Sequence, residues 1–242
     1  MIKRMATCFP KDGIDPDEFW KFHTQVHAKD TVGVSAPGFN RYVMSRVTKV
    51  MSGDPRFYDL TEIWYEDEEA MDKCHQAWKG IVASSGKDIH DDFNSWAKEN
   101  CSFAVEQVIA KDDGLKAVAD MQTNKLVKRA AACSTKEGID PDEFWKYHTQ
   151  VHAPDILKVS GPGLKKYVIS RVNKVIVGQE NQRFYDLVEL WWDSEESMNK
   201  DYEVWKAAKL PNGKTIFDDF DEWIANASSF MMEEFIAKEY RP

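Results

Sequence analysis

The alternation of apolar and charged positions predicts an amphipathic helix that begins at Asp15 and ends near Ser35. Asp15 is a typical helix cap, and Pro16 occupies the first helical position, where a proline costs no hydrogen bond. On a helical wheel one arc carries large apolar side chains and a histidine: Phe19, Phe22, His23 and Val26. Trp20 and His27 flank this arc, and polar side chains cover the opposite side: Asp17, Glu18, Lys21, Thr24 and Gln25. We therefore expect His23 to point into the interior and His27 to lie at its border.

Two extended segments follow this helix, at residues 42–47 and 57–65. In the second segment a period of two places one set of side chains on a single face: Phe57, Asp59, Thr61, Ile63 and Tyr65. The other face carries Tyr58, Leu60, Glu62 and Trp64. Because both faces hold large apolar groups, we expect both to be covered.

Four further elements complete the pattern of the first 111 residues. A short apolar run at residues 3–10 predicts a strand before the first helix. A second helix begins with the acidic run at 66–69 and has a buried stripe: Met71, Cys74, His75 and Trp78. A helical piece at 91–97 and an alternating strand at 102–110 follow. The predicted order is strand, helix, strand, strand, helix, strand.

The whole pattern occurs twice. Residues 13–28 return almost unchanged at 138–153, which indicates an internal duplication. We expect one unit at residues 1–111, a charged and poorly periodic linker at 112–126, and a second unit at 127–242. Each unit has the length of an ordinary small domain.

The order of elements predicts an α+β fold made of two ferredoxin-like βαββαβ units. Such a unit forms a four-stranded antiparallel sheet with its helices on one face, which leaves the other face bare. Two units in one chain can cover these faces by packing sheet to sheet. The expected molecule is a pseudo-dimer within one chain, able to act as a monomer.

Composition narrows the class of protein. The 242 residues are 43% hydrophobic and carry a net charge of -9, which argues against a nucleic-acid or acidic-membrane partner. No signal peptide and no apolar run of spanning length occurs, so a cytoplasmic protein is expected. The four cysteines show no paired spacing and are expected to be reduced core residues. Neither glycine-rich phosphate motif occurs, which makes a nucleotide cofactor improbable.

The strongest candidates for chemistry are His23 and His27, with His148 and His152 in the second unit. A histidine titrates near neutral pH, so one on an apolar helix face can donate or accept a proton. The alternative is a core histidine that only makes a hydrogen bond. A shared metal ion is weighed as well, but no third ligand is apparent and no metal is predicted.

Asp59 and Asp186 are the second pair of candidates, because an acid on a half-buried strand needs a partner. A helix histidine would be oriented by it, and a salt bridge to Arg46 or Arg171 is the alternative. Tyrosines could donate to a developing enolate, or could simply be core residues: Tyr42 and Tyr167.

A wider set of residues is predicted to bind substrate. Arg46 and Arg171 could bind an acidic group or pair with Glu62 and Glu189. Flat rings suit a flat ligand as well as an ordinary core: Trp20, Trp64, Trp78, Trp145, Trp191 and Trp205. The two units differ where His75 and His90 are replaced by Tyr202 and Phe217. Extra titratable groups favour the first unit as the working one.

The repeated motif resembles the EthD-type domain of the dimeric α+β barrel superfamily. The similarity rests on the segment at 15–28, the Pro37-Gly38 turn followed by Arg41-Tyr42, and the strand at 58–64. It covers residues 3–111 and 128–238. The second unit keeps the motif's proline as Pro154, whereas the first unit has Lys29 at this position. The intact motif favours the second unit as the working one.

The resemblance implies a barrel formed by paired sheets, and small cofactor-free enzymes that cyclise, dehydrate or decarboxylate natural products. We therefore expect a cofactor-independent lyase or isomerase acting on a hydrophobic, phenolic or polyketide-like molecule by histidine-centred acid-base catalysis. Two alternatives stay open: a haem-dependent oxidoreductase, since other branches of the superfamily bind haem, and a non-catalytic carrier of small molecules.

Overall fold

The computed structural model describes residues 1–114, 118–178 and 184–239. In the first half the elements are β1 (Ile2–Pro10), α1 (Pro16–Phe22), the π-helical turn η1 (His23–His27), α2 (Ala28–Val34), β2 (Phe39–Ser52), β3 (Asp59–Tyr65), α3 (Glu68–Trp78), α4 (Ile89–Trp96) and β4 (Ala97–Asp112). This is the predicted order of elements. The helix expected at 91–97 begins two residues earlier, because Asp88 caps it, and its last residue is Trp96.

The second half repeats this order after a short extra strand. Its elements are β5 (Gln122–Thr123), β6 (Val127–Thr135), α5 (Pro141–Tyr147), the π-helical turn η2 (His148–His152), α6 (Ala153–Val159), β7 (Leu164–Val177), β8 (Asp186–Trp192), α7 (Glu195–Ala207), α8 (Ile216–Phe220) and β9 (Ile224–Lys238). Strand β5 lies inside the segment expected to be a linker and pairs with β9. Residues 115–117 of that segment lie outside the described residues.

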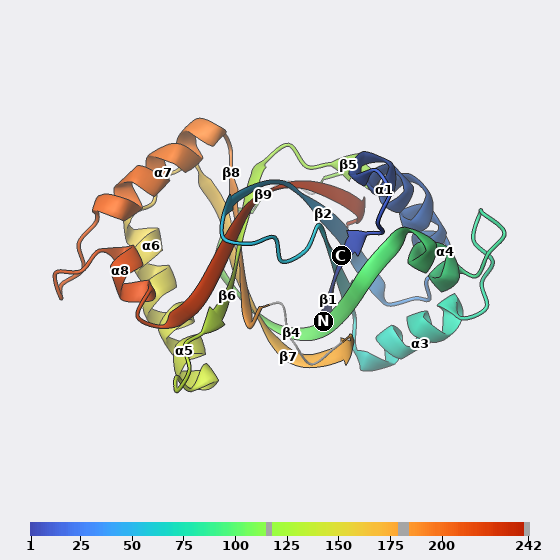
Figure 1. Cartoon of the computed structure of the whole chain (residues 1–242), viewed down its shortest axis with the longest axis horizontal. Coiled ribbons are helices and arrows are strands. Elements are labelled where there is room, and N and C mark those ends of the chain that lie inside the picture. The colour runs from blue at the N-terminus through green and yellow to red at the C-terminus, as the bar shows by residue number, and fades with distance from the viewer. Residues whose placement is uncertain (115–117, 179–183, 240–242) are drawn as a thin grey trace.

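Eight of the strands in the described residues form one closed antiparallel barrel (Figure 1). Their order is β2-β3-β1-β4-β7-β8-β6-β9, and β9 returns to pair with β2. The halves therefore meet along two seams, β4 with β7 and β2 with β9. The expected sheet-to-sheet packing is refined by this result, because the sheet edges also pair across the halves and satisfy their backbone hydrogen bonds.

Strands β2 and β4 are longer than their apolar patterns predict, and the added residues at the end of β2 lengthen its seam with β9. The strand expected at 42–47 spans 39–52, and the strand expected at 102–110 spans 97–112. Strand β4 pairs with β1 over its first part and with β7 over its last part. The seam of β4 with β7 spans residues 102–112, which is close to the predicted strand.

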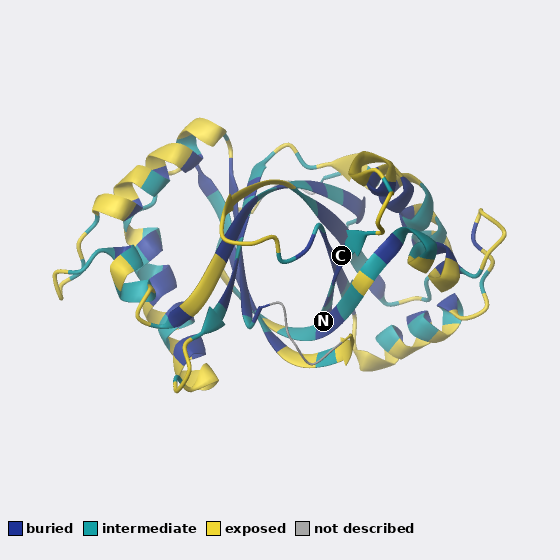
Figure 2. Ribbon diagram, viewed as in Figure 1, coloured by how far each residue is buried: buried dark blue, intermediate teal, exposed yellow. Residues whose placement is uncertain are grey.

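Each sheet has one face against helices and one face inside the barrel, as the apolar pattern predicts for residues 59–65. Before β3 begins, the two predicted faces are exchanged, because Phe57 lies in the barrel core and Tyr58 packs against Phe19. Figure 1 shows the helices of the two halves on opposite sides of the barrel, and Figure 2 shows their exposed outer surfaces. Ile63 and Tyr65 pack under the helices, whereas Leu60 lies in the barrel core. That core joins both halves through Met5, Phe57, Phe103, Phe184, Leu187 and Phe230. Burial of this apolar surface holds the halves together.

Two smaller sequence expectations concern the thiols and the membrane. The four cysteines are free thiols, and Cys8, Cys74 and Cys133 are buried, as expected for core residues. Among the described residues, no helix has both the length and the apolar character that crossing a membrane requires.

Candidate active site

The first helix carries the candidate histidines on a π-helical turn. The Asp15 carboxylate accepts hydrogen bonds from the backbone N–H groups of Asp17 and Glu18, which fixes the start of α1. At η1 the N–H of Ala28 donates to the carbonyl of His23, five residues earlier. One residue is thereby added to the turn, and such turns occur frequently at functional sites.

The added residue changes which side chains are buried. Thr24 was expected on the polar side, but it is buried and its hydroxyl donates to the Trp20 carbonyl at 2.8 Å. Val26 was expected on the buried arc and is only half-buried. Beyond the turn, Thr31 faces inward. The ideal helical wheel failed here because it assumes a constant 3.6 residues per turn.

His23 is held between an acid and a phenol. Its Nδ1 lies 3.0 Å from Oδ2 of Asp59, and its Nε2 lies 3.3 Å from the Tyr42 hydroxyl. His23 is 1% exposed and Asp59 is 0% exposed. The predicted histidine–aspartate pair is present, and the alternative salt bridge from Asp59 to Arg46 is wrong. Asp59 therefore fixes the proton of His23 on Nδ1 and leaves Nε2 to accept one.

Burial keeps Tyr42 and His27 uncharged. Burial and the nearby Asp59 raise the pKa of Tyr42 well above its ordinary value, so the phenol stays protonated and can donate. Burial, with His23 and His90 nearby, lowers the pKa of His27 well below 6.5. The rings of His23 and His27 are 5.5 Å apart. The Tyr42 phenol and the His27 imidazole are therefore neutral hydrogen-bonding groups at pH 7.

One ring nitrogen of His27 is buried without a hydrogen-bond partner among the described residues. Its Nε2 lies 3.4 Å from the Thr31 hydroxyl, whereas its buried Nδ1 has no hydrogen-bond partner among the described residues. If the Thr31 hydroxyl donates to Nε2, the proton of the neutral ring is on Nδ1. His27 then has a buried N–H donor that no described residue accepts.

These side chains line a cavity of about 140 Å³ between the sheet and helices of the first half. Its polar lining consists of Arg4, His23, His27, Thr31, Tyr42, Thr61 and His90. Its apolar lining consists of Met5, Ala6, Ile63, Trp78, Ile89 and Phe93. An apolar cavity of about 150 Å³ holds one benzene ring in another protein, so this cavity has room for a single six-membered ring.

Arg4, on β1, adds a positive charge that the sequence argument missed. Its Nη2 donates to the Ser102 hydroxyl at 2.9 Å, and its Nη1 contacts Nε2 of His75. Burial and this guanidinium lower the pKa of His75 to about 4. The sequence did contain a signal for this role: an arginine occurs in the first strand of each half, as Arg4 and Arg129. A charged side chain in a half-buried strand requires a partner.

The second half keeps the pair but differs around it. Nδ1 of His148 lies 3.0 Å from Oδ2 of Asp186, while Nε2 of His148 has no hydrogen-bond partner among the described residues. Tyr167 is buried there as Tyr42 is in the first half. Burial lowers the pKa of His152 well below 6.5, as for His27.

Larger rings stand where the first half has histidines. Tyr202 replaces His75, and Arg129 lies 3.7 Å from the centre of its ring. Phe217 replaces His90 and stacks with Tyr202 at 6.3 Å between ring centres. His152 is buried against Phe220, at 4.2 Å between rings. The two histidine sites are therefore not equivalent, and the first has more polar groups.

Several predicted substrate-binding residues lie outside the histidine cavity. Arg46 contacts Asp17 and Glu233 and lies over the ring of Trp20, so its expected pairing with Glu62 is wrong. The second half repeats this arrangement: Arg171 pairs with Glu106 and Asp142, lies over Trp145, and does not reach Glu189. Arg46 and Arg171 therefore connect the first helix of each half to the barrel by ion pairs.

The other predicted tryptophans lie on both faces of the sheet. Trp78 lines the histidine cavity, and Trp205 donates its indole N–H to Ser160 in the core of the second half. Trp64 and Trp191 lie on the opposite face of the sheet, inside the barrel. Strand alternation explains this, because Ile63 and Leu190 face the helices and their neighbours must face away.

Comparison with known proteins addresses the fold. No family model and no curated protein matches the chain. An anthrone oxidase-like protein of known structure is 13% identical and superposes with a TM-score of 0.56, covering 98% of this chain and 94% of that chain. The chain therefore has the fold of a dimeric α+β barrel. This confirms, for the fold, what the resemblance to the EthD-type domain implied.

Two further solved structures are similar to this chain at lower TM-scores. An EthD family protein from Bacillus halodurans is 23% identical, with a TM-score of 0.31, and the match covers 47% of this chain and 98% of that chain. A mutant chlorite dismutase from Candidatus Nitrospira defluvii is 7% identical, with a TM-score of 0.47, over 100% of this chain and 91% of that chain.

The histidine cavity of this barrel does not fit haem. Pockets for drug-sized ligands measure about 300–1,000 Å³, and haem is larger than most such ligands, whereas this cavity measures about 140 Å³. Both ring nitrogens of His23 already contact Asp59 and Tyr42. Within residues 1–114, 118–178 and 184–239, no group of three or more histidine, cysteine or acidic side chains is arranged to hold a metal ion.

Proposed function

We propose that this protein is a cofactor-independent lyase or isomerase that acts on a small, largely apolar, phenolic or polyketide-like molecule by acid-base catalysis. One observation carries the proposal: the Asp59-oriented His23, the Tyr42 phenol and the neutral His27 all line one ring-sized cavity. A base and two donors around a single apolar space suit removal of a proton next to a carbonyl.

His23 is the proposed base. Its Nδ1 proton is held by Asp59, so Nε2 accepts the proton from the substrate carbon. The 3.3 Å contact from Nε2 to Tyr42 is long, and a bound substrate would replace it. The imidazolium that forms is stabilised by the Asp59 carboxylate until it returns the proton.

Tyr42, His27 and Arg4 are the proposed partners of the enolate oxygen. The Tyr42 hydroxyl, released from His23, and the Nδ1–H of His27 can donate hydrogen bonds to it. A neutral imidazole suits this role because its charge does not change when it donates. The Arg4 guanidinium also lines the cavity and favours negative charge there.

The enolate can react further in several ways. Attack on a second carbonyl closes a ring, and His23 gives its proton to the new alkoxide. Departure of hydroxide with the His23 proton releases water, and reprotonation at another carbon isomerises the substrate. For loss of carbon dioxide, His23 would first take the proton of the substrate carboxyl group; the bond to the carboxylate then breaks to give carbon dioxide and the same enolate, and His23 returns the proton to carbon. Each course is redox-neutral and needs only groups of this site.

The first half is the proposed working site. Its cavity contains His90 and lies beside the Arg4–His75 contact, whereas Phe217 and Tyr202 stand at the corresponding positions of the second half. The larger rings leave less room beside His148. The proline kept only in the second half, at Pro154, lies in α6 and is half-buried there, outside this set of groups.

Solvent exchange tests the proposal without knowledge of the natural substrate. Cyclohexanone and acetophenone, each with one ring, are incubated with the protein in D₂O, and deuterium next to the carbonyl is followed by NMR. His23→Ala should lower the catalysed rate by about tenfold or more, and His148→Ala should change it little. Circular dichroism of each variant serves as the control for folding. If the protein catalyses no exchange while it binds these ketones, it is a carrier.

We also propose that each half is a ferredoxin-like unit, with boundaries at residues 1–111 and 127–242. The element order strand, helix, strand, strand, helix, strand in each half supports this assignment. On this assignment β5 belongs to the connecting segment, and it adds a short edge beside β9.

A further inference from the structure

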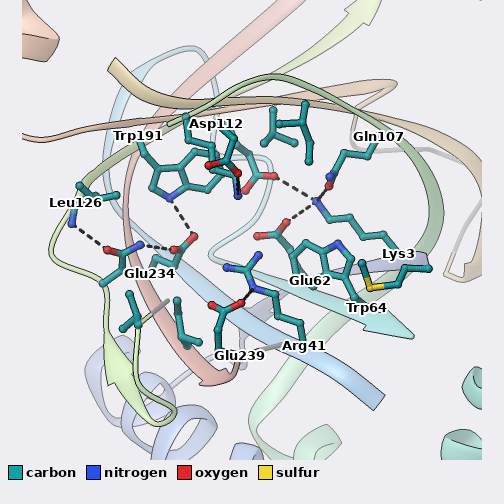
Figure 3. Close-up of a pocket in the computed structure, with 18 residues that line it drawn as sticks. Lys3, Arg41, Glu62, Trp64, Gln107, Asp112, Leu126, Trp191, Glu234 and Glu239 are labelled. Carbon is teal, nitrogen blue, oxygen red and sulfur yellow. Dashed lines mark hydrogen bonds and ion pairs between the residues drawn. The ribbon is translucent and has the colours of Figure 1, made fainter. Parts of the chain in front are cut away.

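A second cavity lies inside the barrel, on the face of the sheet opposite the histidine cavity. It measures about 510 Å³ and reaches the surface near Met1. Figure 3 shows charged side chains from several strands converging on it, among them Lys3, Glu62 and Glu234. None of these groups takes part in the proposed reaction.

The centre of this cavity holds a buried network of charges. Lys3 Nζ lies 2.6 Å from the Glu62 carboxylate, and Lys128 Nζ lies 2.7 Å from Glu189 and 2.8 Å from Glu234. Lys128 also lies 3.3 Å from Glu62. Exposure of these five side chains is at most 4%. Buried charges of this kind are costly unless they are balanced.

The network carries one carboxylate more than it has ammonium groups. Lys3 and Lys128 occupy equivalent positions in the two halves, as do Glu62 and Glu189. The exception to this symmetry is Glu234, whose counterpart in the first half is Gln107. Gln107 accepts a hydrogen bond from Lys3 at 2.8 Å without adding charge. The buried centre therefore has a formal charge of one unit below zero.

Two described basic groups lie nearer the surface, and one of them, Arg41, also acts on the carboxylates of Glu62 and Glu234. Arg41 Nε lies 2.8 Å from Glu239, and Lys166 Nζ lies 3.2 Å from Asp112. Among the described residues of the centre and its rim, acidic groups still outnumber basic groups by one. A cationic ligand would therefore meet a net negative charge.

Glu189 is the carboxylate of this centre that has the fewest donors. Glu234 receives hydrogen bonds from Asn124 at 2.8 Å and from the Trp191 indole at 3.2 Å, besides Lys128. Glu189 contacts Lys128 at 2.7 Å, and its second oxygen lies 3.6 Å from Lys3. Burial and the nearby Glu62 raise the pKa of Glu189. Apart from these ion-pair contacts, neither of its buried oxygens has a hydrogen-bond partner among the described residues.

The walls of the cavity suit a cation attached to an apolar body. The rings of Trp64 and Trp191 already lie beside the ammonium groups of Lys3 and Lys128, at 4.8 and 4.7 Å. Arg41 and Lys166 also lie over these two rings, at 4.7 and 5.6 Å, so this wall of the cavity already attracts cations. Ile109, Val168 and Ile236 provide apolar contacts.

We propose that the barrel cavity binds a small organic amine in its ammonium form, with the ammonium at Glu189 and the apolar body beside Trp64 and Trp191. The ligand supplies the positive charge that the buried centre lacks. This site is independent of the proposed reaction, because its residues point away from His23.

Isothermal titration calorimetry of the whole chain tests this site with benzylamine, benzyl alcohol and benzoate at pH 7.5. Benzylamine should bind at least about tenfold more tightly than the other two, because only it offers a charged donor. The Glu234→Gln variant copies Gln107, balances the centre, and should weaken benzylamine binding by about tenfold. The reverse variant, Gln107→Glu, adds a carboxylate and should strengthen it.

Two further measurements make the result decisive. Thermal unfolding shows whether each variant is folded, and the His23→Ala protein should bind benzylamine as the unaltered chain does. Equal binding of benzylamine and benzyl alcohol would overturn the proposal. So would no detectable benzylamine binding, or equal affinity in both charge variants, because the excess carboxylate would then have no role.

Discussion

Asp59 shows what a single buried acid requires. It is fully buried on β3, and Nδ1 of His23 lies 3.0 Å from one of its oxygens, while the Thr61 hydroxyl donates to the other at 3.3 Å. A carboxylate removed from water needs such partners. The same bonds fix the ring of His23, so the stability and the chemistry of the site depend on one contact.

Replacing Asp59 with asparagine tests that contact. The side chain keeps its size, but it loses the charge that stabilises the imidazolium and can favour the other ring tautomer. The deuterium exchange rate with cyclohexanone should fall by about 100-fold or more, while Asp186→Asn should leave it nearly unchanged. An equal loss in both variants would show that the two halves share the activity.

His75 predicts a specific dependence of stability on pH. Burial and Arg4 lower its pKa from 6.5 to about 4 in the folded protein. Between these values the unfolded chain binds more protons, so the free energy of unfolding rises as pH rises from about 4 to 6.5. His75→Tyr, which copies Tyr202, should flatten this rise in urea unfolding measured at several pH values. An unchanged slope would contradict the buried, neutral state of His75.

Single residues were predictable where their chemistry demanded a partner. The His23–Asp59 pair follows from an acid and a histidine on facing apolar surfaces. Arg4 was missed, although the same reasoning applies to it. The roles of Trp20 and Arg46 could not be predicted, because a flat ring and a guanidinium serve a surface contact as well as a pocket.

At the scale of elements, the π-helical turn sets the geometry of the site. It places His23 against Asp59 and, after one added residue, turns Thr31 toward His27. The pattern of apolar residues predicts the helix but not this turn. A wheel drawn with a constant period cannot show an added residue, because local packing decides where it is accommodated.

Deleting the exposed residue Gln25 should convert this turn into ordinary α-helix. The helix beyond it would rotate by about 100°, which moves Thr31 out of the site and disturbs His27. Exchange activity should fall by about tenfold or more. Deleting Gln150, the equivalent residue of η2, is the matched control and should retain activity at a similar cost in melting temperature. Retained activity in the Gln25 deletion would exclude a role for the turn.

At the scale of the whole molecule, the duplication supplies both partners of a closed barrel. Strands β2 and β4 of the first half each find a partner in the second, at β9 and β7. The repeat predicted that the halves cover one another. It did not predict that their edges pair, because the polar ends of the long strands carry no apolar alternation.

A chain of residues 1–112 alone tests this closure. Its β2 and β4 edges would lack partners, and β2 of one copy can pair with β4 of another, as β2 pairs with β9 in the whole chain. Light scattering after size exclusion should therefore give twice the mass of the half, or larger assemblies. A stable monomer would show that the seams are not needed for folding.

The central claim is that one histidine site, in the first half, receives a ring-shaped ligand. The chain has six histidines, so their ring signals can be followed individually by NMR during titration with phenol, which resembles the proposed enolate. The signals of His23, His27 and His90 should shift together and saturate, while those of His148 and His152 stay in place. Equal shifts in both halves, or none at His23, would contradict the account.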